Sequence, residues 1–132
     1  MKRAVVADTG PLYAAVDPQD AHHHRALEQL QELERERREI IVTFPTLLEA
    51  HSLILFRLGQ TVASRWLVEI SDAALVSPAR EDYRQAFVRV RALPDQRISL
   101  FDATVAALAT RLDLEVWTYD HHFDLMRVKV WR

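Results

Sequence analysis

Four acidic side chains occupy positions at which a parallel α/β sheet would gather ligands. Asp8 directly follows one short apolar run, and Asp120 follows another by two residues. Glu49 and Asp102 each lie in the first turns of a predicted helix. Ligand sites of parallel sheets lie at the carboxyl ends of the strands, and helices that run antiparallel to those strands begin at the same edge. The four carboxylates are therefore predicted to converge, although they span most of the chain.

Converging carboxylates repel one another and need a compensating positive charge. No lysine or arginine lies within several residues of Asp8 or Glu49. A hard divalent cation is the simplest compensation, and oxygen ligands in a chain without cysteine suit Mg²⁺ or Mn²⁺ better than Zn²⁺. One ion at such a site can activate a water, and a second can stabilise the leaving oxygen of a phosphodiester. These residues thus predict phosphoryl chemistry with one or two ions.

Each acid also has a purely structural interpretation. Asp8 and Asp120 fit turn or N-cap positions, and ranges 46–49 and 99–102 have the spacing of a capping box. Against this, Glu49 lies on a helix whose other residues are almost all apolar. A carboxylate in such surroundings is costly unless it has partners.

Short apolar runs that alternate with amphipathic stretches are expected to position the four acids. Strands are predicted over 5–7, 40–43, 74–76, 116–118 and, at an edge of the sheet, 128–130. Helices are predicted over 11–16, from about 23 to 39, over 45–58, 62–70 and 78–93, and after Ser99 through Leu112. This pattern predicts one α/β domain over 1–132, a three-layer α/β/α sandwich with a central parallel sheet of four to five short strands.

The composition is that of an ordinary globular domain, with 132 residues, 49% hydrophobic and 27% charged. The absence of cysteine excludes disulfides and thiolate chemistry, and no apolar run approaches the ~20 residues of a membrane span. Met1-Lys2-Arg3 and the apolar run after it are too short for a signal peptide, so a cytoplasmic protein is expected. The net charge of −2 gives no bulk argument for nucleic acid, yet without the four acids 17 basic residues face 15 acidic ones.

Several arginines and histidines are secondary candidates. Arg80 and Arg84 share one helical stripe, and Arg97 precedes the Asp102 helix, so each could contact RNA phosphates; a solvated face is the alternative. Range 22–24 holds three consecutive histidines, which face different directions on a helix and indicate an exposed helix start. The His121-His122 pair follows Asp120, where one imidazole could approach a substrate.

Five segments together resemble a known family. They are Asp8-Thr9-Gly10, Asp17-Pro18-Gln19-Asp20-Ala21-His22-His23, Thr46-Leu47-Leu48-Glu49, Ser99-Leu100-Phe101-Asp102-Ala103 and Thr118-Tyr119-Asp120-His121-His122-Phe123. Their order and spacing resemble PIN-domain ribonucleases, in particular the VapC-like toxins of type II toxin–antitoxin systems, over nearly the whole chain. The resemblance implies an Mg²⁺- or Mn²⁺-dependent endoribonuclease whose acidic quartet is Asp8, Glu49, Asp102 and Asp120.

The resemblance carries further expectations. It implies supporting hydroxyls at Thr9 and Thr118, a homodimer, and an inhibitory antitoxin that docks on the helical hairpin of residues 46–71. A free-standing PIN nuclease and a catalytically silent PIN-like module for protein binding are the alternatives. A phosphatase or phosphoryl-transfer enzyme with an aspartyl nucleophile is disfavoured, since Gly10 stands where such a site usually has a second acid.

Overall fold

The predicted strands form one parallel sheet. A computed structural model describes residues 4–132, so Met1-Lys2-Arg3 lies outside the described residues. The strands are β1 (Val5–Ala7), β2 (Ile40–Thr43), β3 (Ala74–Val76), β4 (Glu115–Trp117) and β5 (Val130–Trp131). They run in the order β3-β2-β1-β4-β5, and every neighbouring pair is parallel. The central strand β1 therefore ends between the carboxyl ends of β2 and β4, as the predicted site requires.

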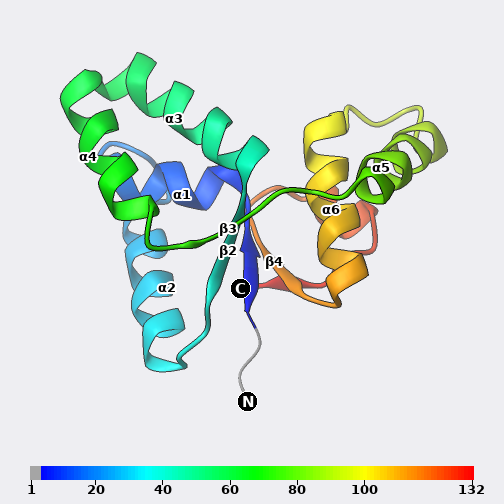
Figure 1. The fold of residues 1–132 in the computed structure, drawn as a ribbon, viewed down its shortest axis with the longest axis horizontal. Coiled ribbons are helices and arrows are strands. Elements are labelled where there is room, and N and C mark those ends of the chain that lie inside the picture. Colours follow the sequence, from blue (N-terminus) through cyan, green and yellow to red (C-terminus); the bar gives the residue numbers. More distant parts are fainter. Residues whose placement is uncertain (1–3) are drawn as a thin grey trace.

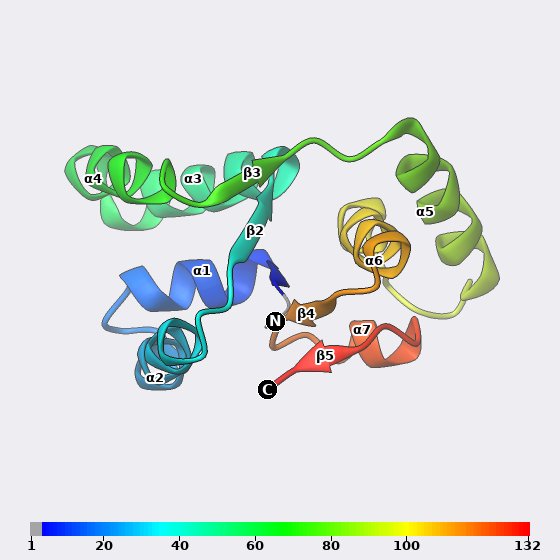
Figure 2. The same cartoon turned by 60° about the horizontal axis from the view of Figure 1, so that its bottom comes forward.

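Helices cover both faces of this sheet. They are α1 (Thr9–Val16), α2 (His23–Arg35), α3 (Phe44–Leu58), α4 (Gln60–Ile70), α5 (Arg80–Ala92), α6 (Leu100–Leu112) and α7 (His122–Leu125). Helices α1 to α4 lie on one side of the sheet and α5 to α7 on the other (Figure 1). Helix α5 packs along α6 at the outside of the molecule (Figure 2). The predicted three-layer α/β/α architecture is confirmed.

The pleat of the strands divides the core between the two faces. Val6 and Val116 are fully buried in a cluster with the apolar side of α6. Val5, Ala7 and Trp117 point to the opposite face, where they pack with residues of α1 and α2. Successive strand residues point to opposite faces. The short runs can therefore be apolar throughout because both faces of the sheet are covered.

Helix α3, which carries Glu49, begins earlier than the capping-box interpretation of range 46–49 expects. Thr43 is the N-cap of α3, and its hydroxyl oxygen accepts the backbone N–H of Thr46 at 3.2 Å. Thr46 already lies inside the helix, so the interpretation of range 46–49 as a capping box is wrong. The helix ends at Gly59, whose φ of 91° is the left-handed conformation that favours glycine.

Other predicted boundaries shift by a few residues. Helix α1 begins two residues early and α2 ends at Arg35 rather than near 39, while β4 and β5 are offset by one or two positions. Helix α5 starts at Arg80 instead of Pro78, because Ala79 is the N-cap and its N–H donates to the Asp82 carboxylate at 2.7 Å. Asp82 is buried there and also pairs with the Arg111 guanidinium at 2.8 Å. The helical spacing of Ala79, Tyr83 and Ala86 predicts that Tyr83 faces the core, but this side chain is 41% exposed.

Over residues 4–132, no helix combines the length and the apolar character needed to cross a membrane.

Candidate active site

The four predicted acids line one pocket at the carboxyl edge of the sheet. Asp8 directly follows β1, and Asp120 follows β4. Glu49 comes from the second turn of α3, and Asp102 from the first turn of α6. The pocket has a volume of about 450 Å³. Its lining consists of Asp8, Thr9, Gly10, Tyr13, Asp20, His22, Glu49, Leu53, Arg57, Ser99, Asp102, Tyr119 and Asp120. The topology thus brings together four carboxylates that come from distant parts of the sequence.

The carboxylate of Asp8 is not spent on helix capping. Asp8 is the N-cap residue of α1, but its side chain makes no capping hydrogen bond. The residue is 6% exposed and borders the pocket. The hydroxyl of Thr118 donates to Oδ2 of Asp8 at 2.8 Å, and the backbone N–H of Thr9 also donates to this carboxylate. Asp8 is therefore held in place by donors on two sides.

The two threonines predicted to support the quartet differ in their contacts. The Thr118 hydroxyl links two acids, since it donates to Asp8 and accepts the backbone N–H of Asp120 at 3.0 Å. Thr9 also lines the pocket, but its buried hydroxyl oxygen has no hydrogen-bond partner. A buried unpaired hydroxyl costs free energy, so a group that binds in this pocket would remove that cost.

Burial and mutual repulsion raise the pKa values of two pocket acids. The pKa of Asp8 is raised from 3.8 to about 6, mainly because burial removes solvent, and repulsion by Asp120 and Glu49 contributes to this rise. The pKa of Asp102 is raised to about 7, again mainly through loss of solvent, with repulsion by Asp8 as the next cause. Hydrogen bonds from Thr118 and Ser99 oppose these two rises. A nearby positive charge would stabilise the ionised form of these two carboxylates, and a bound cation would supply that charge.

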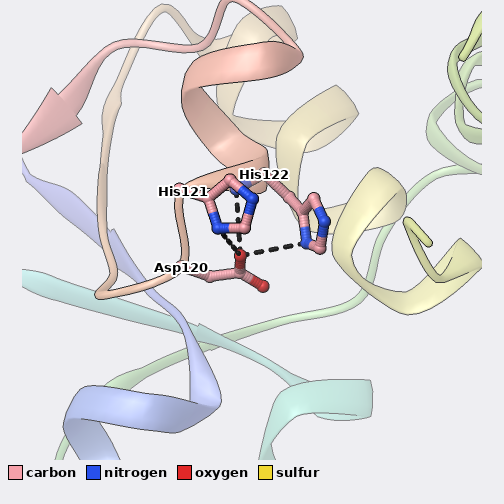
Figure 3. A group of neighbouring side chains, drawn as sticks. All are labelled: Asp120, His121 and His122. Atoms are coloured by element: carbon pink, nitrogen blue, oxygen red, sulfur yellow. Dashed lines mark hydrogen bonds and ion pairs between the residues drawn. The ribbon is translucent and has the colours of Figure 1, made fainter. Parts of the chain in front are cut away.

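Asp120 also faces a pair of histidines. Its Oδ1 accepts the backbone N–H of His122 at 2.9 Å, so the turn interpretation of Asp120 is correct for this oxygen. Nδ1 of His122 lies 3.0 Å from the same oxygen, and Nδ1 of His121 lies 3.8 Å from it. Figure 3 shows both imidazole rings beside the carboxylate. Neither ring lines the acidic pocket, so Asp120 stands between the pocket and this pair.

The predicted arginines lie elsewhere. Arg80 and Arg84 are exposed on α5, Arg97 is exposed in the segment before α6, and none of the three lines the pocket. The pocket instead contains Arg57, the only lysine or arginine in its lining among residues 4–132. The Arg57 guanidinium lies 5.1 Å from the centre of the Tyr13 ring.

Sequence reasoning missed Arg57, although a signal for it exists. Glu49, Leu53 and Arg57 are spaced by four residues along α3, and all three line the pocket. Residues four apart lie on the same side of a helix. Extending the Glu49 stripe by two helical turns would have found the arginine. Four further lining residues were also missed: Tyr13 lies within α1, and Asp20, His22 and Tyr119 lie in connecting segments whose path the sequence pattern does not fix.

Comparison with known proteins places this architecture in a described family and among solved structures. The family model of the PIN domain matches residues 5–129. VapC20 of Mycobacterium tuberculosis, described as a sarcin-ricin loop cleaving toxin, superposes with a TM-score of 0.83 at 18% identity, over 98% of this chain and 99% of that one. No curated protein matches the chain.

Two assemblies contain similar chains. FitAcB from Neisseria gonorrhoeae gives a TM-score of 0.73 at 18% identity, covering 97% of this chain and 96% of that chain. VapBC2 from Rickettsia felis, bound to a DNA fragment from its promoter, gives 0.74 at 13% identity, covering 98% and 97%. At these identities the three superpositions show that the fold is shared.

Proposed function

Because the chain belongs to the PIN-domain family, we propose that it is a divalent-metal-dependent endoribonuclease. The observation that carries the proposal is the convergence of Asp8, Glu49, Asp102 and Asp120 on one pocket. These acids come from four separate segments, and only the sheet order brings them to one edge. Gathering four like charges around a buried carboxylate, Asp8, is unfavourable for the fold alone, so it indicates a functional site.

The donors of the pocket fit a hard cation, Mg²⁺ or Mn²⁺. Carboxylate oxygens are the ligands that these ions prefer, and the unpaired hydroxyl of Thr9 adds one more oxygen. Asp8, Glu49, Asp102 and Asp120 are the proposed ligands for one or two ions. When bound, the metal supplies positive charge to the phosphate and an activated water.

The side chains of the pocket prepare this binding before any ligand arrives. Thr118 fixes Oδ2 of Asp8 and the backbone beside Asp120, so two acids are oriented through one hydroxyl. The Ser99 hydroxyl accepts the N–H of Asp102 at 3.0 Å and bonds to its carboxylate. Partners of this kind orient ligands and commonly change metal affinity about 10–100-fold when removed.

The proposed substrate is an RNA phosphodiester. Hydrolysis forms a bond between a water oxygen and phosphorus and breaks the bond to the 3′ oxygen, which takes up a proton. The products are a 5′-phosphate and a 3′-hydroxyl, and the 2′-hydroxyl is not the nucleophile. Arg57 at the pocket can contact a phosphate directly, whereas Arg80, Arg84 and Arg97 can contact phosphates only away from the pocket.

The test is cleavage of total cellular RNA followed by sequencing of the ends. Mg²⁺-dependent cleavage with 5′-phosphate ends is expected, and both Asp8→Asn and Asp102→Asn should lose it. Asp95→Asn, an exposed acid in the segment before α6, is the matched control and should retain it. Cleavage that survives in both pocket variants, or that persists with EDTA, would contradict the proposal. Folded wild-type protein that cleaves nothing in Mg²⁺ or Mn²⁺ would favour the silent module.

We also propose that the chain is the toxin of a toxin–antitoxin pair. The α3–α4 hairpin, which overlaps the expected docking range 46–71, exposes apolar side chains that a partner would cover: Leu48 is 66% exposed, Phe56 86% and Val68 72%. Isolated proteins rarely leave such a group open to water. Co-expression with the neighbouring reading frame should give a complex in which hydrogen exchange of the hairpin slows. A neighbour that neither binds nor inhibits would favour a free-standing nuclease.

A homodimer is the proposed assembly of this chain. Helix α5 exposes Phe87 and Val88, and the first turn of α6 exposes Leu100, so apolar surface remains outside the hairpin. Sedimentation velocity should show a dimer whose dissociation is promoted by Phe87→Asp. A monomer at every concentration would contradict the dimer and leave the nuclease proposal intact.

A further inference from the structure

We propose that Asp120, His121 and His122 form a second metal site beside the acidic pocket. This site would bind Zn²⁺ or a similar transition-metal ion. Each of the three residues offers one ligand atom, and these atoms lie within 4.8 Å of one another. Figure 3 shows the two imidazoles on the same side of the carboxylate. The three ligands are consecutive at the start of α7, so one short segment carries the whole set.

The distances are close to those of a zinc site. Zinc lies about 2.0–2.2 Å from its nitrogen and oxygen ligands, so two ligands of a tetrahedral ion are about 3.3–3.6 Å apart. Oδ1 of Asp120 is 3.0 Å from Nδ1 of His122 and 3.8 Å from Nδ1 of His121, and all three ligand atoms lie within 4.8 Å of one another, so small side-chain rotations would bring them to these separations. The His121 side chain is 75% exposed, so its ring has room to turn the remaining distance, although it also contacts the His122 ring with 4.3 Å between the centroids. A tetrahedral ion with three protein ligands has a fourth position that water can fill.

The ligand types select the ion. Two imidazole nitrogens with one carboxylate suit Zn²⁺ and its neighbours in the transition series, whereas Mg²⁺ prefers oxygen and binds imidazole poorly. Nδ1 of His122 already lies 3.0 Å from Oδ1 of Asp120. Zinc binds imidazole through an unprotonated nitrogen, so any proton on the ligating nitrogen passes to solvent when zinc binds. The acidic pocket is therefore expected to prefer Mg²⁺, and the site with the two histidines is expected to prefer Zn²⁺.

Asp120 connects the two sites. It lines the acidic pocket, while His121 and His122 do not, so an ion on the histidine side shares the Asp120 carboxylate with the pocket. That ion neutralises part of the charge that attracts Mg²⁺ and adds a positive charge of its own. Zinc and magnesium are thus expected to weaken each other's binding by the same factor. This antagonism rests on the proposed function, whereas zinc binding itself does not.

Zinc binding can be measured directly on an untagged chain. Competition with a chromophoric zinc chelator should show one tight Zn²⁺ per chain, and His121→Ala and His122→Ala should each weaken it at least tenfold. His24→Ala is the matched control, because His24 lies in another histidine run, on α2, and is exposed. Asp102→Asn should retain the tight zinc, since it alters only the acidic pocket. Circular dichroism checks that each variant is folded.

Each result bears on the proposal. Zinc affinity that is equal in wild type, His121→Ala and His122→Ala would overturn it, and so would a tight zinc that disappears in Asp102→Asn alone. Under the antagonism, saturating the zinc site should lower Mg²⁺ affinity in wild type by severalfold, with no such change in His121→Ala. Unchanged Mg²⁺ affinity would refute the antagonism. A chain that cleaves no RNA would contradict the nuclease proposal, and the zinc titration would still decide the site.

Discussion

Replacing Asp8 by asparagine should stabilise the metal-free chain at neutral pH while abolishing metal-dependent cleavage. The carboxylate is 6% exposed and repelled by Asp120 and Glu49, and these conditions penalise its charged form. An amide removes the charge and keeps an acceptor oxygen for the Thr118 hydroxyl and the Thr9 N–H. The substitution therefore removes the cost of the charge and leaves the hydrogen bonds.

The size and the pH range follow from the raised pKa. A folded pKa of about 6 against an ordinary 3.8 means that the folded chain binds the proton more tightly than the unfolded chain. Stability is then highest below pH 3.8 and falls as the pH rises through the interval up to about 6. The loss is complete above that interval and amounts to about 3 kcal/mol. Asp8→Asn should recover about this amount at pH 8 and almost none at pH 3.5.

Urea unfolding in EDTA at pH 8 and at low pH measures the effect. For a chain of this size about 3 kcal/mol corresponds to a melting temperature about 10 °C higher. Excess Mg²⁺ should stabilise wild type by mass action and leave Asp8→Asn unchanged. The difference in free energy of unfolding between the two proteins should therefore become smaller. Asp95→Asn serves as the exposed control. If Asp8→Asn is no more stable than wild type at pH 8 in EDTA, the buried charge of Asp8 does not destabilise the folded chain.

Three further outcomes are expected. Thr118→Val should weaken Mg²⁺ binding about 10–100-fold by calorimetry because Asp8 loses its donor, while Thr118→Ser should bind nearly as wild type does. Mg²⁺ binding at pH 6–7 should release protons, since the pKa values of Asp8 and Asp102 are raised to about 6 and about 7; heats that are identical in buffers of different ionisation enthalpy would contradict this. Gln29→Leu should cost about 2 kcal/mol in urea unfolding, because the buried Gln29 Oε1 accepts from both the Trp117 indole at 2.8 Å and the Tyr119 hydroxyl at 2.6 Å. An exposed glutamine of the same helix is the control.

The sheet could be predicted because its strands are short, apolar on both faces and bounded by turn residues. Strands 5–7, 40–43 and 74–76 have the predicted bounds. Once parallel strands are assigned, the edge that gathers their carboxyl ends follows, and with it the meeting of the four acids. The meeting of the four acids could therefore be predicted from the topology of the sheet, without knowledge of side-chain contacts.

Glu49 lines the pocket at the predicted edge of the sheet, but the expectation that its carboxylate is surrounded by apolar residues and costly for that reason is wrong. The apolar residues around it do not bury the helix on all sides, since Leu48 and Phe56 are largely exposed and Glu49 is exposed with them. A sequence pattern shows which side chains are apolar but does not show which of them a partner covers. The exposed face of α3 is better explained by the proposed partner than by the core.

The start of α5 shows a second limit. Ser77-Pro78 is a common helix beginning, yet the helix starts at Arg80. The Asp82 carboxylate accepts the N–H of the N-cap residue Ala79 and also pairs with Arg111. Asp82 and Arg111 are far apart in the sequence and meet only after α5 packs on α6. Contacts that depend on how two helices dock are not contained in local propensity.

The burial of the four acids is unequal, and this predicts how their substitutions should differ. Asp8 ends the central strand and is buried, Asp102 is partly buried, and Glu49 lies exposed on the rim formed by α3. If all four hold the metal, each amide variant should lose cleavage. Asp8→Asn and Asp102→Asn should stabilise the metal-free chain at pH 8, because burial raises the pKa of these two carboxylates, whereas Glu49→Gln removes an exposed charge and should stabilise it little. Equal stabilisation by Glu49→Gln would show that repulsion among the acids, rather than burial at the centre of the sheet, determines the cost of the site.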